Sequence, residues 1–204
     1  MTVLWMLGIP LAYLLGTLPS AQLVARRRGR DPLAEGSRNP GATNVARLVG
    51  WRGGVVVLLV DFAKGALPTL AGLALGGRGA GLALGAASVV GHIFPVTRRF
   101  RGGKGVATAT GVLVVLFPLI CAGAAVVFFV VVRITHTASI ASLVIAIGVP
   151  IVVAVLGAPW LEVVTLAALG ALVVIRHVPN LRRLLRGDEL GLGPGSVRAD
   201  EEDA

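Results

Sequence analysis

The sequence predicts an all-α, polytopic integral membrane protein with about seven transmembrane helices, and its composition leads directly to that class. Of the 204 residues, 55% are hydrophobic and only 14% are charged, and the mean hydropathy is +0.86. Soluble domains carry about 25% charged residues, and disordered chains are poor in hydrophobic residues, so both classes are excluded. The 28 glycines favour close packing of helices within lipid.

The first predicted span is the apolar run from Val3 to Ala25. No lysine or arginine precedes it, whereas three arginines, Arg26 to Arg28, follow it directly. A signal peptide carries its charges in front of the apolar run. We therefore expect a retained helix, with the N-terminus outside the cell and the arginines in the cytoplasm. Further apolar runs occupy residues 53–76, 80–97, 105–132, 138–157 and 159–175.

The run 105–132 contains Pro118 near its middle and is interpreted as two short helices that meet at the proline. The distribution of charge selects this interpretation over a single long helix. With two short helices, all the strongly basic segments face the cytoplasm, as the positive-inside rule requires, and so does the C-terminus. These segments hold 17 of the 19 lysines and arginines and comprise residues 26–52, 98–104, 133–137 and 176–204.

The formal net charge of +9 lies in short segments between apolar runs. This placement indicates membrane orientation or anionic substrates rather than a nucleic-acid partner. The single cysteine, Cys121, lies in an apolar run and is expected to be a core residue. We expect residues 1–187 to form one transmembrane domain and residues 188–204 to form a disordered cytoplasmic tail.

Three polar segments on the predicted cytoplasmic side carry the candidate chemistry, and the first runs from Gly36 to Asn44, followed by Arg47. Its glycines let backbone N–H groups point into one concavity, while the side chains of Ser37, Thr43 and Asn44 add donors. A helix beginning near Thr43 would direct its N-terminus to the same place. Such an arrangement holds a phosphate without a metal. An ordinary loop with a helix cap is the alternative.

The second segment spans residues 92–105. Its residues 102–105 resemble part of a nucleotide-binding P-loop, but the glycine required before the lysine and the Ser or Thr required after it are absent. What is left is Lys104 in a glycine turn at the start of a helix, which suits a phosphate clamp. Arg98 and Arg99 are interpreted as determinants of topology.

The third segment spans residues 176–183. His177 and Asn180 are three positions apart and can share a helical face, although Pro179 disturbs it. The alternative is that His177 is simply an interfacial residue.

Two further polar pairs lie in or beside the predicted spans. Asp61 and Lys64 are three residues apart inside the second span, where ionisable groups are costly and usually functional. An internal ion pair that fixes helix packing is the equally weighted alternative. Ser139 and Ser142 open the sixth span and either cap it or bind a substrate.

Taken from the residues alone, three classes of function fit these segments: a lipid-synthesis transferase with a phosphorylated substrate, an anion transporter and a structural membrane protein. Transporters often show repeated halves and broken helices near the midplane. The sequence has no internal repeat, and its polar motifs gather at one face. This pattern favours an enzyme at the membrane interface.

Together the segments resemble the bacterial acyl-phosphate:glycerol-3-phosphate acyltransferases (PlsY type) over roughly residues 8–190. The resemblance rests on Gly36-Ser37-x-Asn39-Pro40-Gly41-Ala42-Thr43-Asn44-x-x-Arg47, Asp61-x-x-Lys64-Gly65, Gly91-His92-x-Phe94-Pro95, Phe100-x-Gly102-Gly103-Lys104-Gly105, and Arg176-His177-x-x-Asn180-x-x-Arg183 through Glu189. It implies transfer of a fatty acyl group from acyl phosphate to the 1-hydroxyl of sn-glycerol 3-phosphate. The products would be 1-acyl-glycerol 3-phosphate (lysophosphatidate) and phosphate, in the first acylation of phospholipid synthesis.

The resemblance also implies roles for individual residues. Catalytic roles are expected for Ser37, Lys104, Ser142 and His177. Substrate-binding roles are expected for Gly36, Asn39, Gly41, Thr43, Asn44, Arg47, Gly102, Gly103, Ser139 and Asn180. Within these sets, the loop from Ser37 to Thr43 would hold the acyl phosphate, whereas Arg47, Lys104, His177 and Asn180 would bind glycerol 3-phosphate. No metal and no cofactor are expected.

Two groups are candidates to accept the hydroxyl proton, His177 and the leaving phosphate itself, and the sequence does not choose between them. Another large class of glycerol-phosphate acyltransferases uses a histidine followed five residues later by an aspartate. Here the positions five residues after the three histidines hold Thr97, Ala141 and Arg182. Acyl phosphate is therefore the expected donor, rather than acyl-CoA or acyl carrier protein.

The resemblance places the protein in the bacterial plasma membrane with its active site facing the cytoplasm. It also implies a functional link to an enzyme that produces acyl phosphate. Two positions depart from the family pattern: Arg38 stands where a glycine is common, and His136-Thr137 stands where Arg followed by an aromatic residue is usual. A divergent paralogue, or an anion transporter that binds phosphorylated ligands without acyl transfer, is the alternative function.

Overall fold

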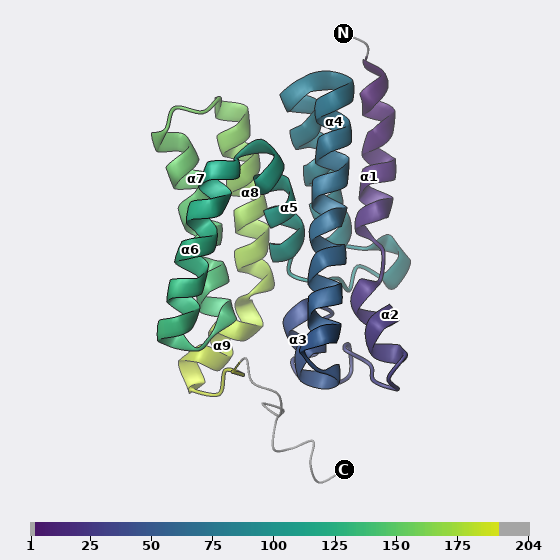
Figure 1. Cartoon of the computed structure of the whole chain (residues 1–204), viewed down its shortest axis with the longest axis vertical. Helices are drawn as coiled ribbons and strands as arrows, with labels where there is room; N and C mark the ends of the chain where they lie inside the picture. Colours follow the sequence, from purple (N-terminus) through teal and green to yellow (C-terminus); the bar gives the residue numbers. More distant parts are fainter. Residues whose placement is uncertain (1–2, 192–204) are drawn as a thin grey trace.

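The structure is a computed structural model that describes residues 3–191, and these residues form helices and loops without a strand. Figure 1 shows the helices running up and down the long axis of the molecule. In chain order they are η1 (Val3–Leu7), α1 (Gly8–Gly16), α2 (Ser20–Arg26), α3 (Ala42–Val49), α4 (Trp51–Ile93), η2 (Val96–Arg98), α5 (Val106–Leu116), α6 (Pro118–Thr135), α7 (Ala138–Val155), α8 (Trp160–Arg176) and α9 (Val178–Arg186).

The described part of the chain contains four helical segments long and apolar enough to cross a membrane: Leu4–Arg26, Trp51–Arg98, Pro118–Thr135 and Ala138–Val155. The pair α8 and α9, bent by 49°, adds a fifth if it counts as one span, and α5 is a shorter apolar helix. The all-helical, apolar architecture is as predicted. The count of seven crossings and the outward N-terminus stay predictions.

Helix α4 is a hairpin of two arms rather than one straight rod. Its 43 residues are interrupted at Gly77, whose φ of 78° and ψ of −166° are not helical. The arm before Gly77 is about 39 Å long and the return arm only about 24 Å at 1.5 Å per residue. The loop that follows the return arm, residues 94–105, therefore lies inside the molecule, short of the end where α4 begins (Figure 1).

The predicted break near Pro118 is confirmed. Phe117, with φ −138° and ψ 59°, separates α5 from α6, and Pro118 occupies the first turn of α6, where its missing N–H is harmless. Near this break, Arg78 links α4 to α5 and α8. Its guanidinium donates to both carboxylate oxygens of Glu162 at 2.6 and 3.0 Å and to the Leu116 carbonyl at 2.8 Å, and it stacks on the Phe117 ring.

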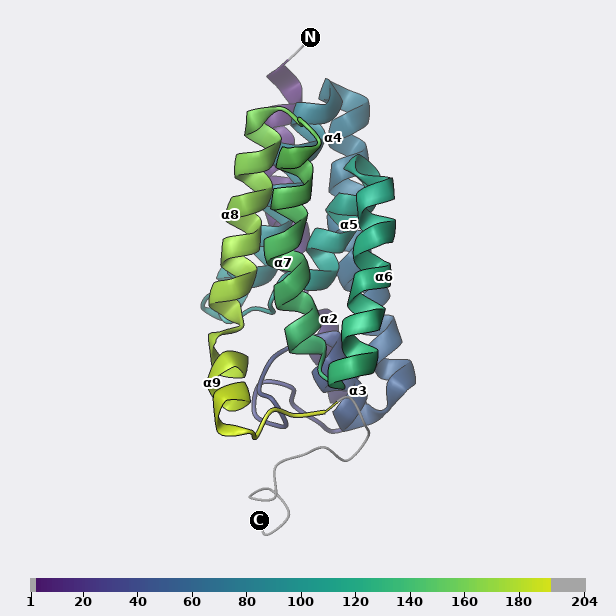
Figure 2. The same ribbon diagram turned by 90° about the vertical axis from the view of Figure 1, so that its left-hand side faces the viewer.

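Glycines bring the central hairpin close to its neighbours. A Cβ on Gly16 of α1 would collide with the carbonyl of Ser88, and a Cβ on Gly65 of α4 would collide with the carbonyl of Thr108 on α5. Backbones can approach this closely only where side chains are absent. Helix α4 thus packs against α1 on one side and α5 on the other (Figures 1 and 2).

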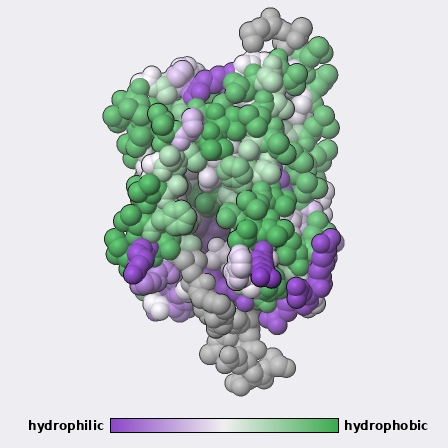
Figure 3. Space-filling model, in the orientation of Figure 1, coloured by the Kyte–Doolittle hydropathy of each residue, from purple (hydrophilic) through white to green (hydrophobic). Residues whose placement is uncertain are grey.

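The main hydrophobic core lies between α4, α5, α7 and α8, and Cys121 packs into it as expected. Apolar side chains cover most of the height of the molecule, and hydrophilic residues gather at the end formed by α2, α3 and α9 (Figure 3). All three candidate polar segments lie toward this end.

Candidate functional site

The turn between α8 and α9 presents the first group of site residues. His177 is 1% exposed, and its Nδ1 lies 2.7 Å from the carbonyl oxygen of Val173. A carbonyl only accepts, so Nδ1 carries the proton and Nε2 holds the lone pair. The pattern therefore fixes the neutral tautomer whose Nε2 can accept a proton or a hydrogen bond.

Helix α9 and the chain that follows it close around one carboxylate, Glu189. The amide of Asn180 donates to Oε1 at 2.5 Å, and the Arg183 guanidinium donates to Oε2 at 2.7 Å. Arg47 of α3 donates to the carbonyls of Leu190 and Gly191 at 3.2 and 2.9 Å. Segments more than 140 residues apart in the chain are joined here.

These contacts correct the predicted beginning of the tail. Residues 189–191 are held by side chains of α3 and α9, so this part of the predicted tail belongs to the folded body. The segment 192–204 lies outside the described residues. Arg183 and Glu189 were given no role from the sequence. For Arg183 a signal was present, because Asn180 and Arg183 are three residues apart and can share one face of α9.

Lys104 reaches the same site from the loop between α4 and α5. The loop is held rigidly: the Gly103 N–H donates to the His92 carbonyl at 3.1 Å, and Arg176 donates to the carbonyls of Gly102 and Gly103 at 2.8 and 3.3 Å. A side chain on either glycine would collide with His92. The two glycines thus place Lys104, and their expected contact with a substrate stays a prediction.

The pKa of Lys104 is influenced by several charged side chains that lie near it. Burial lowers the pKa of its ammonium to about 7; Glu189 opposes this shift, and Arg183 and Arg47 add to it. We call Arg47, Lys104, His177, Asn180 and Arg183, together with Glu189, the anion site. Four of the predicted residues therefore meet in one place, where three permanent or titratable cations face a single carboxylate.

The glycine loop before α3 is organised by Asn44, which is 1% exposed. Its side-chain oxygen accepts the Ser37 N–H at 2.9 Å, and its amide donates to the carbonyls of Pro32 and Glu35 at 3.1 and 3.0 Å. A substrate-binding role for Asn44 stays a prediction, whereas its contacts show a local, structural role. Asn44 has both amide hydrogens engaged within the loop and positions Ser37.

The remaining loop residues surround the N-terminus of α3. Gly41 is the residue before the helix and makes no side-chain cap, and Thr43 in the first turn is half-buried. A Cβ on Gly41 would lie 2.7 Å from the side-chain amide of Asn39, so Asn39 packs over this glycine. Arg38 adopts a left-handed φ of 55°, a conformation in which glycine is favoured.

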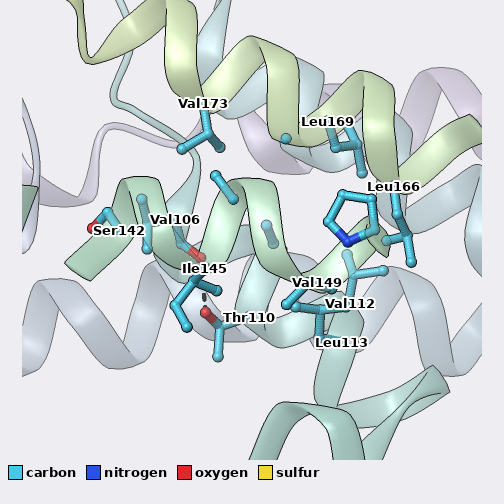
Figure 4. A pocket seen from close by; sticks show the side chains of 14 residues that line it. Val106, Thr110, Val112, Leu113, Ser142, Ile145, Val149, Leu166, Leu169 and Val173 are labelled. Atoms are coloured by element: carbon cyan, nitrogen blue, oxygen red, sulfur yellow. Dashed lines mark hydrogen bonds between the residues drawn. The ribbon is translucent and has the colours of Figure 1, made fainter. Parts of the chain in front are cut away.

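Ser142 connects the polar end to an apolar cavity. Its hydroxyl donates to the Ala138 carbonyl at 2.8 Å, and its side chain lines the cavity. The cavity, of about 60 Å³, runs between α5, α7 and α8, from Ser142 and Val106 at one end to Leu166 at the other (Figure 4). Val106 follows Lys104 by two residues, so the cavity opens beside the loop that carries Lys104.

Ser139, one turn before Ser142, is 5% exposed, and its hydroxyl oxygen has no hydrogen-bond partner in the described part of the chain. The side-chain oxygen of Asn180 is buried and unpartnered in the same sense. Buried polar atoms are normally satisfied. Among the predicted site residues that the structure describes, these two are the fully buried side-chain atoms that lack a hydrogen-bond partner.

Asp61 and Lys64 form an internal ion pair, which favours the structural alternative. Both side chains are 2% exposed, and Nζ of Lys64 lies 2.6 Å from Oδ1 of Asp61. Lys64 also donates to the Leu18 carbonyl at 2.7 Å, and Ser20 donates to Asp61 at 2.5 Å. The pair therefore joins α4 to the turn between α1 and α2.

Arg98 was expected to serve topology alone, and this is wrong. Its guanidinium donates to Gln22 Oε1 at 2.9 Å and to the Thr17 carbonyl at 3.0 Å. It ties the loop after α4 to the junction of α1 and α2. Arg99, by contrast, is exposed, as its interpretation requires.

Known proteins resemble the chain along almost all of its length. The sequence model of the family described as glycerol-3-phosphate acyltransferase matches residues 6–187. A relative of that name from Desulforudis audaxviator (strain MP104C) is 42% identical over 184 residues, which cover 90% of this chain and 93% of the relative. Another from Methylococcus capsulatus is 43% identical over 196 residues, covering 95% and 98%.

The fold is likewise similar to solved structures. A crystal structure of PlsY (YgiH), an integral membrane glycerol 3-phosphate acyltransferase in its glycerol 3-phosphate form, gives a TM-score of 0.88 at 36% identity. It covers 93% of this chain and 96% of that one. The lysophosphatidic acid form of the same protein gives 0.85 at 35% identity, covering 93% and 95%.

Proposed function

Because the chain belongs to the glycerol-3-phosphate acyltransferase family, we propose that it transfers a fatty acyl group from acyl phosphate to the 1-hydroxyl of sn-glycerol 3-phosphate. In this reaction the hydroxyl oxygen bonds to the acyl carbon, and the bond from that carbon to the phosphate oxygen breaks. The products are 1-acyl-glycerol 3-phosphate and inorganic phosphate. The protein is a membrane-embedded, multi-pass acyltransferase; the donor is the part proposed.

The observation that carries the proposal is the anion site. Arg47, Lys104 and Arg183 gather around the one carboxylate of Glu189, which leaves an excess of positive charge among these residues. A phosphate dianion supplies both the charge and the several acceptor oxygens that such donors need. The phosphate of glycerol 3-phosphate is proposed to bind here, with Asn180 as a further donor.

The second substrate is proposed to place its phosphate at the glycine loop. Gly36, Ser37, Asn39, Gly41 and Thr43 precede or open α3, whose uncapped first turn points backbone N–H groups outward. A helix N-terminus with free N–H groups favours an anion. Arg47 lies on the same helix α3, so the two phosphates would lie on adjacent parts of one polar surface.

The acyl chain is proposed to occupy the apolar cavity between α5, α7 and α8. From Ser142 to Val149 the cavity follows α7 for about 10 Å, and its lining beyond Ser142 is almost entirely apolar. With the chain in this cavity, the acyl carbonyl lies at the Ser142 end. That end adjoins the loop with Lys104, so the carbonyl and the phosphate groups meet at the mouth.

The transfer itself needs orientation and a proton acceptor. Acyl phosphate is already activated, so donors at the mouth, Ser142 and Lys104 among them, would stabilise the oxyanion that forms on the acyl carbonyl. The hydroxyl proton would pass either to Nε2 of His177, whose tautomer is set by Val173, or to the departing phosphate. In both routes the proton that leaves the hydroxyl has a named acceptor, so the reaction balances.

The reaction is proposed to take place on the cytoplasmic face of the bacterial plasma membrane, which the water-soluble glycerol 3-phosphate can reach. The unstable acyl phosphate implies a neighbouring enzyme that produces it. The proposed chemistry uses no metal and no cofactor.

The donor is tested with purified protein in detergent or nanodiscs, supplied with glycerol 3-phosphate and, in turn, acyl phosphate, acyl-CoA or acyl carrier protein. We expect lysophosphatidate and phosphate in equal amounts from acyl phosphate alone. Turnover of acyl-CoA without turnover of acyl phosphate would overturn the donor assignment.

The acyl cavity is tested on α7 with two matched variants. Ala146→Phe fills the cavity, whereas Ala154→Phe adds the same ring to an exposed position of the same helix. We expect Ala146→Phe to lower kcat/KM for long-chain acyl phosphate by roughly tenfold or more relative to a short-chain donor. Equal chain-length profiles for the two variants would contradict the placement.

A further inference from the structure

A second cavity, of about 440 Å³, lies where the end of α2 meets the start of α4, and nothing in the acyltransfer reaction uses it. We call it the arginine cavity. It is lined by Val24, Arg27, Arg28, Val49, Gly50, Trp51, Arg52, Gly53 and Val56. We propose that it binds the phosphate headgroup of an anionic phospholipid of the surrounding membrane.

The charge of the cavity is uncompensated. Arg26 and Arg30, which flank its basic residues in sequence, pair with Asp31 and Glu35. Among residues 3–191, Arg27 and Arg28 have no acidic partner. Arg52 makes only a cation–π contact, with its guanidinium 5.5 Å from the ring centroid of its neighbour Trp51. A concave surface with three unpaired guanidinium groups attracts an anion.

The walls of the cavity are apolar, which selects a lipid over free phosphate. Val24, Val49 and Val56 line it beside the arginines. Trp51 is 68% exposed at its rim, and tryptophan is enriched where a membrane meets water. Above the cavity α4 continues with an exposed apolar face that includes Leu59, 60% exposed.

A phospholipid fits both parts of this surface at once. Its headgroup phosphate would lie among the arginines and its acyl chain along the exposed face of α4. Basic pockets of this kind, at the boundary of membrane helices, are the usual hosts of anionic headgroups. A free phosphate ion would leave the valine walls and Trp51 without a function.

The arginine cavity is separate from the anion site, although α3 contributes to both. Arg47 faces the carbonyls of residues 190 and 191, whereas Val49 faces the cavity. Two residues along a helix are about 200° apart around its axis. The inference is therefore independent of which donor the enzyme uses.

The test measures the fluorescence of Trp51. In full-length protein with Trp5 and Trp160 replaced by Phe, Trp51 is the one fluorophore of its kind. The protein is placed in nanodiscs of phosphatidylcholine containing a small fraction of brominated phosphatidylglycerol or brominated phosphatidylcholine, since bromine quenches nearby tryptophan. We expect saturable quenching by the anionic lipid at about one tenth of the mole fraction that the zwitterionic lipid needs.

Three matched variants make the result specific. The triple variant R27Q/R28Q/R52Q should lose the preference for phosphatidylglycerol, and R27K/R28K/R52K should keep most of it. The control R99Q/R101Q/R133Q removes the same charge from exposed arginines elsewhere and should keep it fully. Thermal unfolding and acyl transfer, which none of these residues serves, verify that each protein is folded.

Three outcomes would overturn the proposal. One is equal quenching by both lipids in the parent protein. Another is an equal loss of preference in the cavity variant and the control, which would indicate diffuse attraction of the basic face. The third is displacement of the brominated lipid by millimolar inorganic phosphate, which would identify a site for free phosphate.

Discussion

Removal of the Lys104 ammonium should cost the enzyme most of its affinity for the phosphate substrate, and the structure sets the size of the loss. The side chain stands in a loop whose backbone is fixed by contacts from His92 and Arg176, so the position of Lys104 at the anion site is set. A hydrogen bond to a charged group contributes about 1.5–3 kcal/mol. Lys104→Ala should therefore lower kcat/KM for glycerol 3-phosphate by roughly 10- to 150-fold.

The same lysine should set the alkaline limit of activity. Burial lowers its pKa to about 7 in the unliganded protein, so the charged form is complete at lower pH and is lost as pH rises through about 7. Since kcat/KM reports the free enzyme, it should fall in this range. Lys104→Arg should remove this alkaline limb, because a guanidinium does not deprotonate, while it recovers only part of the activity.

The assay is phosphate release from acyl phosphate at varied glycerol 3-phosphate, with Arg99→Ala as the control. Arg99 lies five residues earlier and is exposed, and its loss should change kcat/KM by less than about threefold. If Lys104→Ala and Arg99→Ala lose activity equally, while both proteins insert and fold normally, the loop is a diffuse basic surface and the anion site is wrongly assigned.

Three further outcomes are expected. Asp61→Asn leaves the buried Lys64 ammonium without its partner and should destabilise the protein by about 3–5 kcal/mol, seen as a lower midpoint of thermal unfolding; an unchanged midpoint would show that the pair is dispensable. Arg38→Gly relieves a left-handed residue and should raise stability by up to about 1 kcal/mol, and a lower midpoint would contradict the strain argument. Cysteines introduced at Arg101 and Arg186 should be labelled from the same side of the membrane, and labelling from opposite sides would exclude two spans between residues 105 and 132.

The sequence by itself determined the class of protein and the helix breaks near Gly77 and Pro118, but not the break at residues 17–19, where the predicted span Val3–Ala25 divides into α1 and α2. Hydrophobic content and short basic segments are properties of the chain read in order, so the all-helical membrane class followed from them. Pro118 lacks an N–H and would clash with the preceding turn, so it favours the first turn of a helix, although Pro68 and Pro150 lie inside α4 and α7. The glycine loop and Lys104 were likewise singled out from local sequence alone, as a candidate phosphate-binding loop and a candidate phosphate clamp.

Only the tertiary structure decided which of the polar groups act together. Arg47, Lys104 and Glu189 are far apart in sequence and meet because the short return arm of α4 places the loop of Lys104 inside the molecule, where α3 and α9 close over it. No local pattern encodes that depth, since it depends on helix lengths and on packing between glycines. The same holds for Asn44: its residue type marks it as a donor, but its donors are engaged by carbonyls of its own loop. The sequence determines the chemistry of each side chain, whereas the tertiary structure determines which partners lie within its reach.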